Sequence, residues 1–280
     1  MINLARLFRD YNQTASLNEH LNLYGFISDH AFLTKSGDIG VVLSIAGVDY
    51  ECLDQANTDT IVQRLQVALK LFDDQYRIYQ YLFKRNNRRI PFQFYQSSIL
   101  NEAIQNRMAF FESKAEELYS HEIHYVILFE GFRHQKASLL SALWNPKSAL
   151  RIVRESLSHR RQIRLLEAEL NSVLNLLMYR TAAFISHLSD LCEVRMLNKD
   201  EVFRFLRSLV NFAPHKIEHS HLKHDTFLDY YVPDSALECH RGHLLVDDFF
   251  VRVLSLKEPS SQSFPLIFKA LLEVQANFHI

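Results

Sequence analysis

The order strand, strand, helix, strand is indicated twice in this sequence, and it restricts the fold more than any other feature. In the first occurrence, apolar runs at 31–34 and 39–46 flank a polar turn at 35–38, which predicts a β-hairpin. Apolar residues then follow helical spacing after Asn57, a residue type favoured at helix N-caps. Residues 76–83 alternate as a strand does, so this region predicts a complete strand-strand-helix-strand unit.

The second occurrence lies at the C-terminal end. Residues 243–246 and 249–256 predict a hairpin, Ser263 is expected to cap a helix, and 275–280 predicts the start of a strand. Because the sequence stops inside that strand, we expect it to be cut from a longer protein. The pattern predicts an α+β fold, with two strand-strand-helix-strand units on mixed or antiparallel sheets and a long helical arm inserted between them.

The region between the two units is expected to be mostly helical. Residues 90–95 and 123–129 read as strands on either side of a helix at 99–119. No proline or glycine occurs in 147–190, which predicts one very long helix or a helical hairpin. A further helix is expected to begin after Asn198. We expect three parts: an N-terminal α+β unit at 1–135, a helical arm at 136–212, and a His-rich connection with the C-terminal unit at 213–280.

Composition narrows the class of protein. The 31 basic and 32 acidic residues nearly balance, which argues against a dedicated nucleic-acid binder. Three widely spaced cysteines form no CxxC pair, so a disulfide or zinc framework is not indicated and a reducing cytoplasm fits best. No segment reaches the roughly 18 to 20 apolar residues of a membrane-spanning helix.

The phosphate-binding loop of nucleotide hydrolases is absent from the sequence. That loop needs the pattern GxxxxGK[ST], and none of the six glycines is followed by lysine. We therefore expect that this chain alone neither binds nor hydrolyses ATP, and we assign it no catalytic and no cofactor-binding residue.

One cluster has the composition of a metal site. A solvated loop is the favoured interpretation, because the spacing fits neither metallo-hydrolases nor structural zinc sites, and no metal ligand is assigned. A metal-dependent hydrolase remains an alternative. The residues are His215, His219, His221, His224, Asp225, Cys239 and His240.

Two basic features could contact an anionic surface. Between residues 147 and 164 the sequence has six basic residues and one acidic residue, and four of the basic residues fall on one helical face beside an apolar stripe. A solvated, ion-paired face is the competing interpretation, and binding of nucleic acid is a further alternative. The candidate residues are Lys147, Arg151, Arg154 and Arg161 of that face, and Lys84, Arg85, Arg88 and Arg89 of a predicted basic turn.

Several segments spread along the sequence share the pattern of one known family. They are Tyr24–Ile27, Leu33–Asp38, Val41–Tyr50, Tyr79–Arg85, Ile104–Arg107, Tyr125–Leu128, Leu228–Val232 and Val251–Pro259. Together they resemble the N-terminal region of the type IV secretion and conjugation ATPases, the TrbE/CagE/VirB family. The resemblance extends over nearly the whole chain, and it rests on diffuse strand patterns rather than on a chemical signature.

The resemblance implies that the intact protein is an ATPase that energises a secretion or conjugation channel, with its ATP and magnesium motifs beyond residue 280. This chain would then be a docking domain, cytoplasmic and peripheral to the bacterial inner membrane. Its implied partners are inner-membrane channel subunits, further copies of the full-length protein and an anionic membrane surface. No catalytic residue of the family can be placed on this chain.

Overall fold

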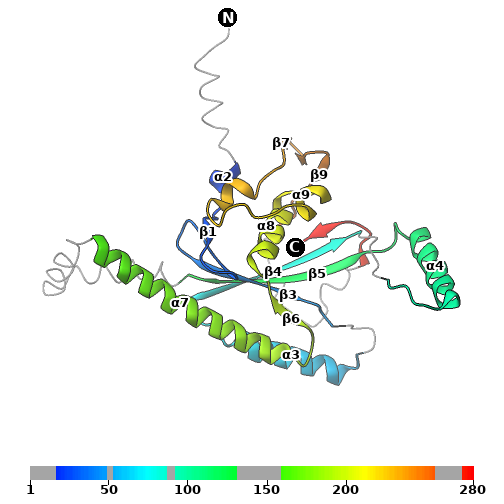
Figure 1. The fold of residues 1–280 in the computed structure, drawn as a ribbon, viewed down its shortest axis with the longest axis horizontal. Coiled ribbons are helices and arrows are strands. Elements are labelled where there is room, and N and C mark those ends of the chain that lie inside the picture. The colour runs from blue at the N-terminus through cyan, green and yellow to red at the C-terminus, as the bar shows by residue number, and fades with distance from the viewer. Residues whose placement is uncertain (1–16, 49–52, 87–91, 131–158, 256–272) are drawn as a thin grey trace, which may run out of the picture.

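The computed structural model describes residues 17–48, 53–86, 92–130, 159–255 and 273–280, with the backbone alone for 159–167. Within these ranges the chain is an α+β protein with antiparallel sheets, as expected from the sequence (Figure 1). The helices are α2 (Leu17–His20), α3 (Gln55–Leu69), α4 (Ser98–Ser113), α7 (His159–Leu188), α8 (Lys199–Val210), α9 (Pro214–Glu218) and α10 (Leu228–Tyr231). The strands are β1 (Gly25–Phe26), β2 (Ala31–Leu33), β3 (Ile39–Ile45), β4 (Tyr76–Arg85), β5 (Ser120–Phe129), β6 (Val194–Met196), β7 (Leu237–Cys239), β8 (Leu244–Val246), β9 (Phe249–Val251) and β10 (Phe278–His279).

The main sheet draws strands from distant parts of the sequence. Its order is β1-β2-β3-β5-β4-β10, and β6 also pairs with β3. Every one of these pairings is antiparallel. The predicted C-terminal hairpin forms as β8 and β9, but with β7 it makes a separate three-stranded sheet, while β10 joins the main sheet. The part of the second unit that was expected to be a helix lies outside the described residues.

The first hairpin is held by the chemistry of its turn. Gly37 has a φ of +89°, a conformation that glycine adopts without steric cost. The buried carboxylate of Asp38 accepts hydrogen bonds from the hydroxyl of Ser36 at 2.6 Å and from that of Thr34 at 3.1 Å. Both bonds reach the same carboxylate oxygen, Oδ2, and they tie the two ends of the β2–β3 turn together.

Helix α3 begins slightly earlier than the sequence indicated. The carboxylate of Asp54 accepts the backbone N–H of Asn57 at 2.7 Å, so Asp54 is the N-cap and Asn57 lies in the first turn. The prediction at Asn57 was wrong because Asp54 and Asn57, three residues apart, are both of a type that caps helices well. The helix begins after Asp54.

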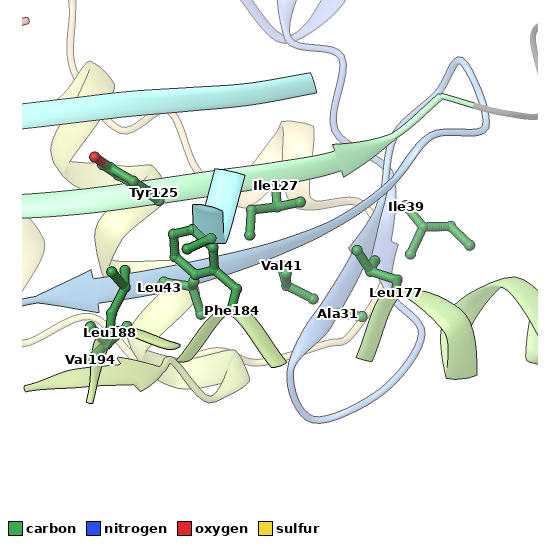
Figure 2. Packing of buried hydrophobic residues seen from close by; sticks show 11 residues of the cluster. Ala31, Ile39, Val41, Leu43, Tyr125, Ile127, Leu177, Phe184, Leu188 and Val194 are labelled. Atoms are coloured by element: carbon green, nitrogen blue, oxygen red, sulfur yellow. The ribbon is translucent and has the colours of Figure 1, made fainter. Parts of the chain in front are cut away.

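One face of the main sheet is covered by α3 and α7. Leu177, Phe184 and Leu188 of α7 are buried against Val41 and Ile127 of the sheet (Figure 2). The C-terminal half of α7 is therefore part of the core, and only its N-terminal half extends beyond the sheet (Figure 1).

The other face is covered by α8. The side chain of Asn198 accepts the backbone N–H of Glu201 at 3.0 Å, and the carboxylate of Glu201 accepts the backbone N–H of Asn198 at 3.0 Å. This capping box confirms the predicted start of the helix. Behind it, Val202 and Phe205 are buried against the sheet.

His124 of β5 is partly buried and packs against aromatic residues of this second core. Its ring lies 4.8 Å from that of Phe205 and 5.8 Å from that of Phe83, centroid to centroid, and its Nδ1 has no hydrogen-bond partner. Burial, with added repulsion from Arg85 and Arg195, lowers the pKa of His124 to about 4.

This burial makes a pH dependence of stability testable. Below about pH 6.5 the unfolded chain protonates His124 while the folded chain does not, so the free energy of unfolding falls as pH drops from about 6.5 to 4 and the effect levels off below that. We expect the wild type to lose about 2 kcal/mol more than a His124→Phe variant between pH 7 and pH 5. Urea unfolding at the two pH values measures this, and equal losses in both proteins would refute it.

Candidate interaction surface

Most of the predicted basic residues lie outside the described residues. This holds for Lys147, Arg151, Arg154, Arg88 and Arg89. Arg161 lies on α7 within residues 159–167, for which only the backbone is described. For the helical basic face, contact with an anionic surface therefore stays a prediction.

Lys84 is placed differently from the sequence expectation. It belongs to β4 rather than to a turn, and only 3% of it is exposed. Its ammonium donates a hydrogen bond to the carbonyl of Val274 at 2.5 Å and lies 4.6 Å from the centre of the Tyr119 ring. A buried lysine needs such partners, and Lys84 is thus not available to an outside surface.

Arg85 is half-exposed at the end of the same strand. Its guanidinium lies 4.5 Å from the centre of the Phe83 ring and 3.8 Å from the carboxylate of Glu122. An ion pair of this length and exposure contributes little stability, so Arg85 keeps a charge that an anion can approach.

The His-rich segment does not converge on a metal site. His215, His219, His221 and His224 are all exposed, and the carboxylate of Asp225 is bonded to the ammonium of Lys199 at 3.1 Å. Across the described part of the chain, no group of three or more His, Cys, Asp or Glu side chains is arranged to hold a metal ion.

The His-rich connection at 213–241 is instead attached to α8 through a polar network around the buried side chain of Arg207. The guanidinium of Arg207 donates hydrogen bonds to the carbonyl of Lys216 at 2.8 Å, to that of Tyr231 at 2.6 Å and to the carboxylate of Asp234 at 2.7 Å. Two parts of the connection, at residue 216 and at residues 231–234, are thereby fixed to one side chain. These contacts explain how a polar segment with little regular structure keeps a defined path.

Asn211, at the end of α8, completes the network. Its amide nitrogen donates to the carbonyl of Val232 at 2.8 Å, and its amide oxygen accepts the backbone N–H of Asp234 at 2.8 Å and the hydroxyl of Ser235 at 3.0 Å. The side chain is fully buried, so each of these bonds satisfies a group that water cannot reach.

The clearest candidate for an external contact is α4. In Figure 1 this helix stands beyond the N-terminal end of β5, away from the two faces of the sheet, and none of its residues is buried. Large apolar side chains are nevertheless exposed on it and on the segment before it. We call these residues the α4 surface: Phe92, Phe94, Tyr95, Ile99, Leu100 and Phe110.

The α4 surface has a defined shape because its two segments are tied together. The side-chain oxygen of Asn101 accepts the backbone N–H of Tyr95 at 2.8 Å, and its amide nitrogen donates to the carbonyl of Tyr95 at 2.7 Å. The rings of Phe92 and Phe94 pack edge to face at 5.2 Å. Residues 92–101 carry no charge, and uncharged, aromatic patches of this kind are typical of the centres of protein interfaces.

The sequence interpretation missed this surface. It predicted a strand at 90–95, but residues 92–95 form no strand, and the helix predicted to reach residue 119 ends at Ser113. The missed signal was the run of aromatic and uncharged polar residues at 92–98, just before Ile99. Residues 92–95 of this run do not pair with the sheet.

Comparison with known proteins supports the resemblance seen in the sequence. Residues 30–136, less than half of the chain, match the family described as "Type IV secretion system ATPase VirB4/TrbE, N-terminal domain". The match includes β2 to β5 and the whole α4 surface. No curated protein matches the chain, and no helix in the described residues is long and apolar enough to cross a membrane.

Proposed function

Taking the VirB4/TrbE-type N-terminal domain at residues 30–136 as the premise, we propose that this chain is a non-catalytic docking and assembly domain of a type IV secretion ATPase. The proposal places ATP and magnesium in another part of the full-length protein, because this chain has no phosphate-binding loop. It also places the protein at the cytoplasmic face of the bacterial inner membrane, as a homo-oligomer in contact with channel subunits.

The α4 surface carries the docking part of the proposal. Its exposed aromatic and aliphatic residues belong to neither hydrophobic core of the described residues, and α4 has no buried residue. Keeping such a surface in water is unfavourable unless a partner covers it. We take the partner to be a channel subunit of the inner membrane, because the family works with a secretion channel and the patch has the uncharged composition of a protein interface.

Substitution of Phe94, Ile99 and Leu100 by serine tests this. Because these side chains are exposed, we expect the free energy of unfolding of the domain to change by less than about 0.5 kcal/mol for each substitution. We expect recovery of channel subunits with the affinity-purified full-length ATPase to fall at least about tenfold, since removing one central aromatic contact commonly costs about 2 kcal/mol or more.

The matched control removes exposed apolar residues elsewhere. Val62 and Val67 are exposed on α3, and their replacement by serine should leave recovery of the channel subunits unchanged. Undiminished recovery with the α4 variant would refute docking through this surface, and equal losses with both variants would show a general effect of surface polarity.

A further inference from the structure

Three exposed aromatic residues lie where the chain crosses the edge of β1 and enters α10. We call them the α10 patch: Tyr24, Phe227 and Tyr230, which are 46%, 61% and 72% exposed. The backbone N–H of Leu228 donates to the carbonyl of Tyr24 at 3.0 Å, and that of Tyr230 donates to the carbonyl of Phe227 at 2.9 Å. The three side chains therefore leave the backbone at neighbouring points of one surface.

Phe227 has a backbone conformation that does not suit a phenylalanine. Its φ is +61°, in the left-handed region that residues other than glycine seldom adopt. It is also the N-cap of α10, where its side chain makes no capping hydrogen bond and where serine, threonine, aspartate, asparagine or glycine is favoured. Its ring belongs to neither hydrophobic core. A costly and exposed phenylalanine at this position indicates that the ring contacts something beyond the described residues.

The first sixteen residues of the sequence lie outside the described ranges and carry an apolar pattern. We call its members the N-terminal stripe: Leu4, Leu7, Phe8 and Tyr11. Their spacing of i, i+3, i+4 and i+7 places side chains on one face of a helix. At 100° per residue the charged residues of the segment fall on the opposite side, and these are Arg6, Arg9 and Asp10. The sequence thus predicts an amphipathic helix whose apolar face needs a partner.

The chain that follows this segment is fixed beside the α10 patch. α2 begins at Leu17 and lies against α10. The ammonium of Lys35 donates to the carbonyl of Asn18 at 2.8 Å and pairs with the carboxylate of Asp229 at 2.8 Å, so one side chain joins α2 to α10. As a helix, residues 4–11 measure about 10 Å, and residues 12–16 can span up to roughly 17 Å. The N-terminal stripe can therefore reach the patch.

We propose that the N-terminal stripe packs on the α10 patch, so that residues 1–16 of this chain are the partner of the exposed rings. Because the two are joined through α2, the effective concentration of the stripe at the patch is on the order of millimolar. The charged side of the helix stays in water when the stripe is covered.

A lipid surface is the competing partner for an amphipathic helix. The stripe is less suited to it, because the opposite face carries only two basic residues and one acidic residue and the tether holds the segment at the patch. α2 and β1 stand apart from α4 in Figure 1. The inference therefore does not use the α4 surface, and the two proposals succeed or fail separately.

Photo-crosslinking of the full 280-residue chain tests the proposal, with p-benzoylphenylalanine in place of Phe8. We expect crosslinks to residue 24 and to residues 227–230, mapped by mass spectrometry. The double variant Phe227→Gly, Tyr230→Ser should reduce them at least about tenfold, because two of the three covered rings are gone. Since glycine adopts a φ of +61° without steric cost, this variant should stay folded and melt within a few degrees of the wild type.

The matched control removes an exposed aromatic residue elsewhere. Tyr179, on α7, is 74% exposed, and Tyr179→Ser should leave the crosslinks unchanged. In the segment itself, Leu4→Ser with Leu7→Ser should abolish crosslinking to the patch, whereas Arg6→Gln with Arg9→Gln should retain it.

Two results overturn the proposal directly: no crosslink to the patch in the wild-type background, or undiminished crosslinking in the Phe227→Gly, Tyr230→Ser variant. Crosslinks that join isotopically light and heavy chains in a mixture would overturn it in favour of a second copy as the partner. Pelleting with phosphatidylglycerol vesicles that Leu4→Ser with Leu7→Ser abolishes, without any crosslink to the patch, would overturn it in favour of a lipid surface.

Discussion

A leucine in place of Asn211 is expected to lower the free energy of unfolding by about 2 to 6 kcal/mol. The side chain has nearly the same volume, so packing changes little, but the carbonyl of Val232 and the backbone N–H of Asp234 lose their partners. Each buried group left without a hydrogen bond costs about 1 to 3 kcal/mol. Folded domains of this kind are stable by about 5 to 15 kcal/mol, so the loss is a large fraction of the total.

Urea unfolding followed by circular dichroism measures this loss, and amide exchange locates it. Exchange in the variant should rise first around residues 232–235, which depend on Asn211 for their attachment to α8. Asn171, exposed on α7, provides the control, because Asn171→Leu should change stability by less than about 0.5 kcal/mol. A similar small change at Asn211 would show that water replaces the lost bonds.

The second large effect is expected at Gly40, in the centre of the main sheet. Gly40 pairs with Phe32 on one side and with Leu128 on the other, and a Cβ added to it would overlap the Phe32 ring and the Leu128 side chain. Phe32 is buried, so its ring has no free space to move into. Alanine should cost about 1 to 3 kcal/mol through overpacking, and valine should cost more.

Thermal unfolding of Gly40→Ala and Gly40→Val checks this order. Gly242→Ala is the matched control, because a Cβ at Gly242 meets no atom within 4 Å and the variant should melt within a few degrees of wild type. If Gly40→Ala melts like the control, the sheet adjusts at this point more easily than its packing indicates.

The features that could be predicted from the sequence depend on neighbours in the chain. The β2–β3 hairpin follows from Gly37 and Asp38, which lie in the short turn at 34–38 between the two strands. The start of α8 follows from Asn198 and Glu201, three residues apart. In each case the residues that form the hydrogen bonds also form the pattern, so local chemistry determines the structure.

The features that were missed depend on residues far away in the sequence. Lys84 reads as part of an exposed basic run, and nothing near it indicates that the carbonyl of Val274 and the ring of Tyr119 will enclose it. The pairing of β6 with β3 and of β10 with β4 is likewise set by tertiary packing. For the candidate interaction surface, the aromatic residues were visible, but their exposure was not, because a strand at 90–95 would have buried every second one.

The distance along the chain between β4 and β10 also has a consequence for how this protein is made. A ribosome adds roughly 5 to 20 residues per second, so the 190 residues that separate Lys84 from Val274 take roughly 10 to 40 s to synthesise. During that interval β4 has emerged without β10, and the carbonyl that Lys84 needs does not yet exist. The half-made chain therefore presents this edge of β4 without β10, with a lysine that must stay in water until β10 is made. We expect nascent chains of this protein to depend on chaperones that bind exposed strands during synthesis.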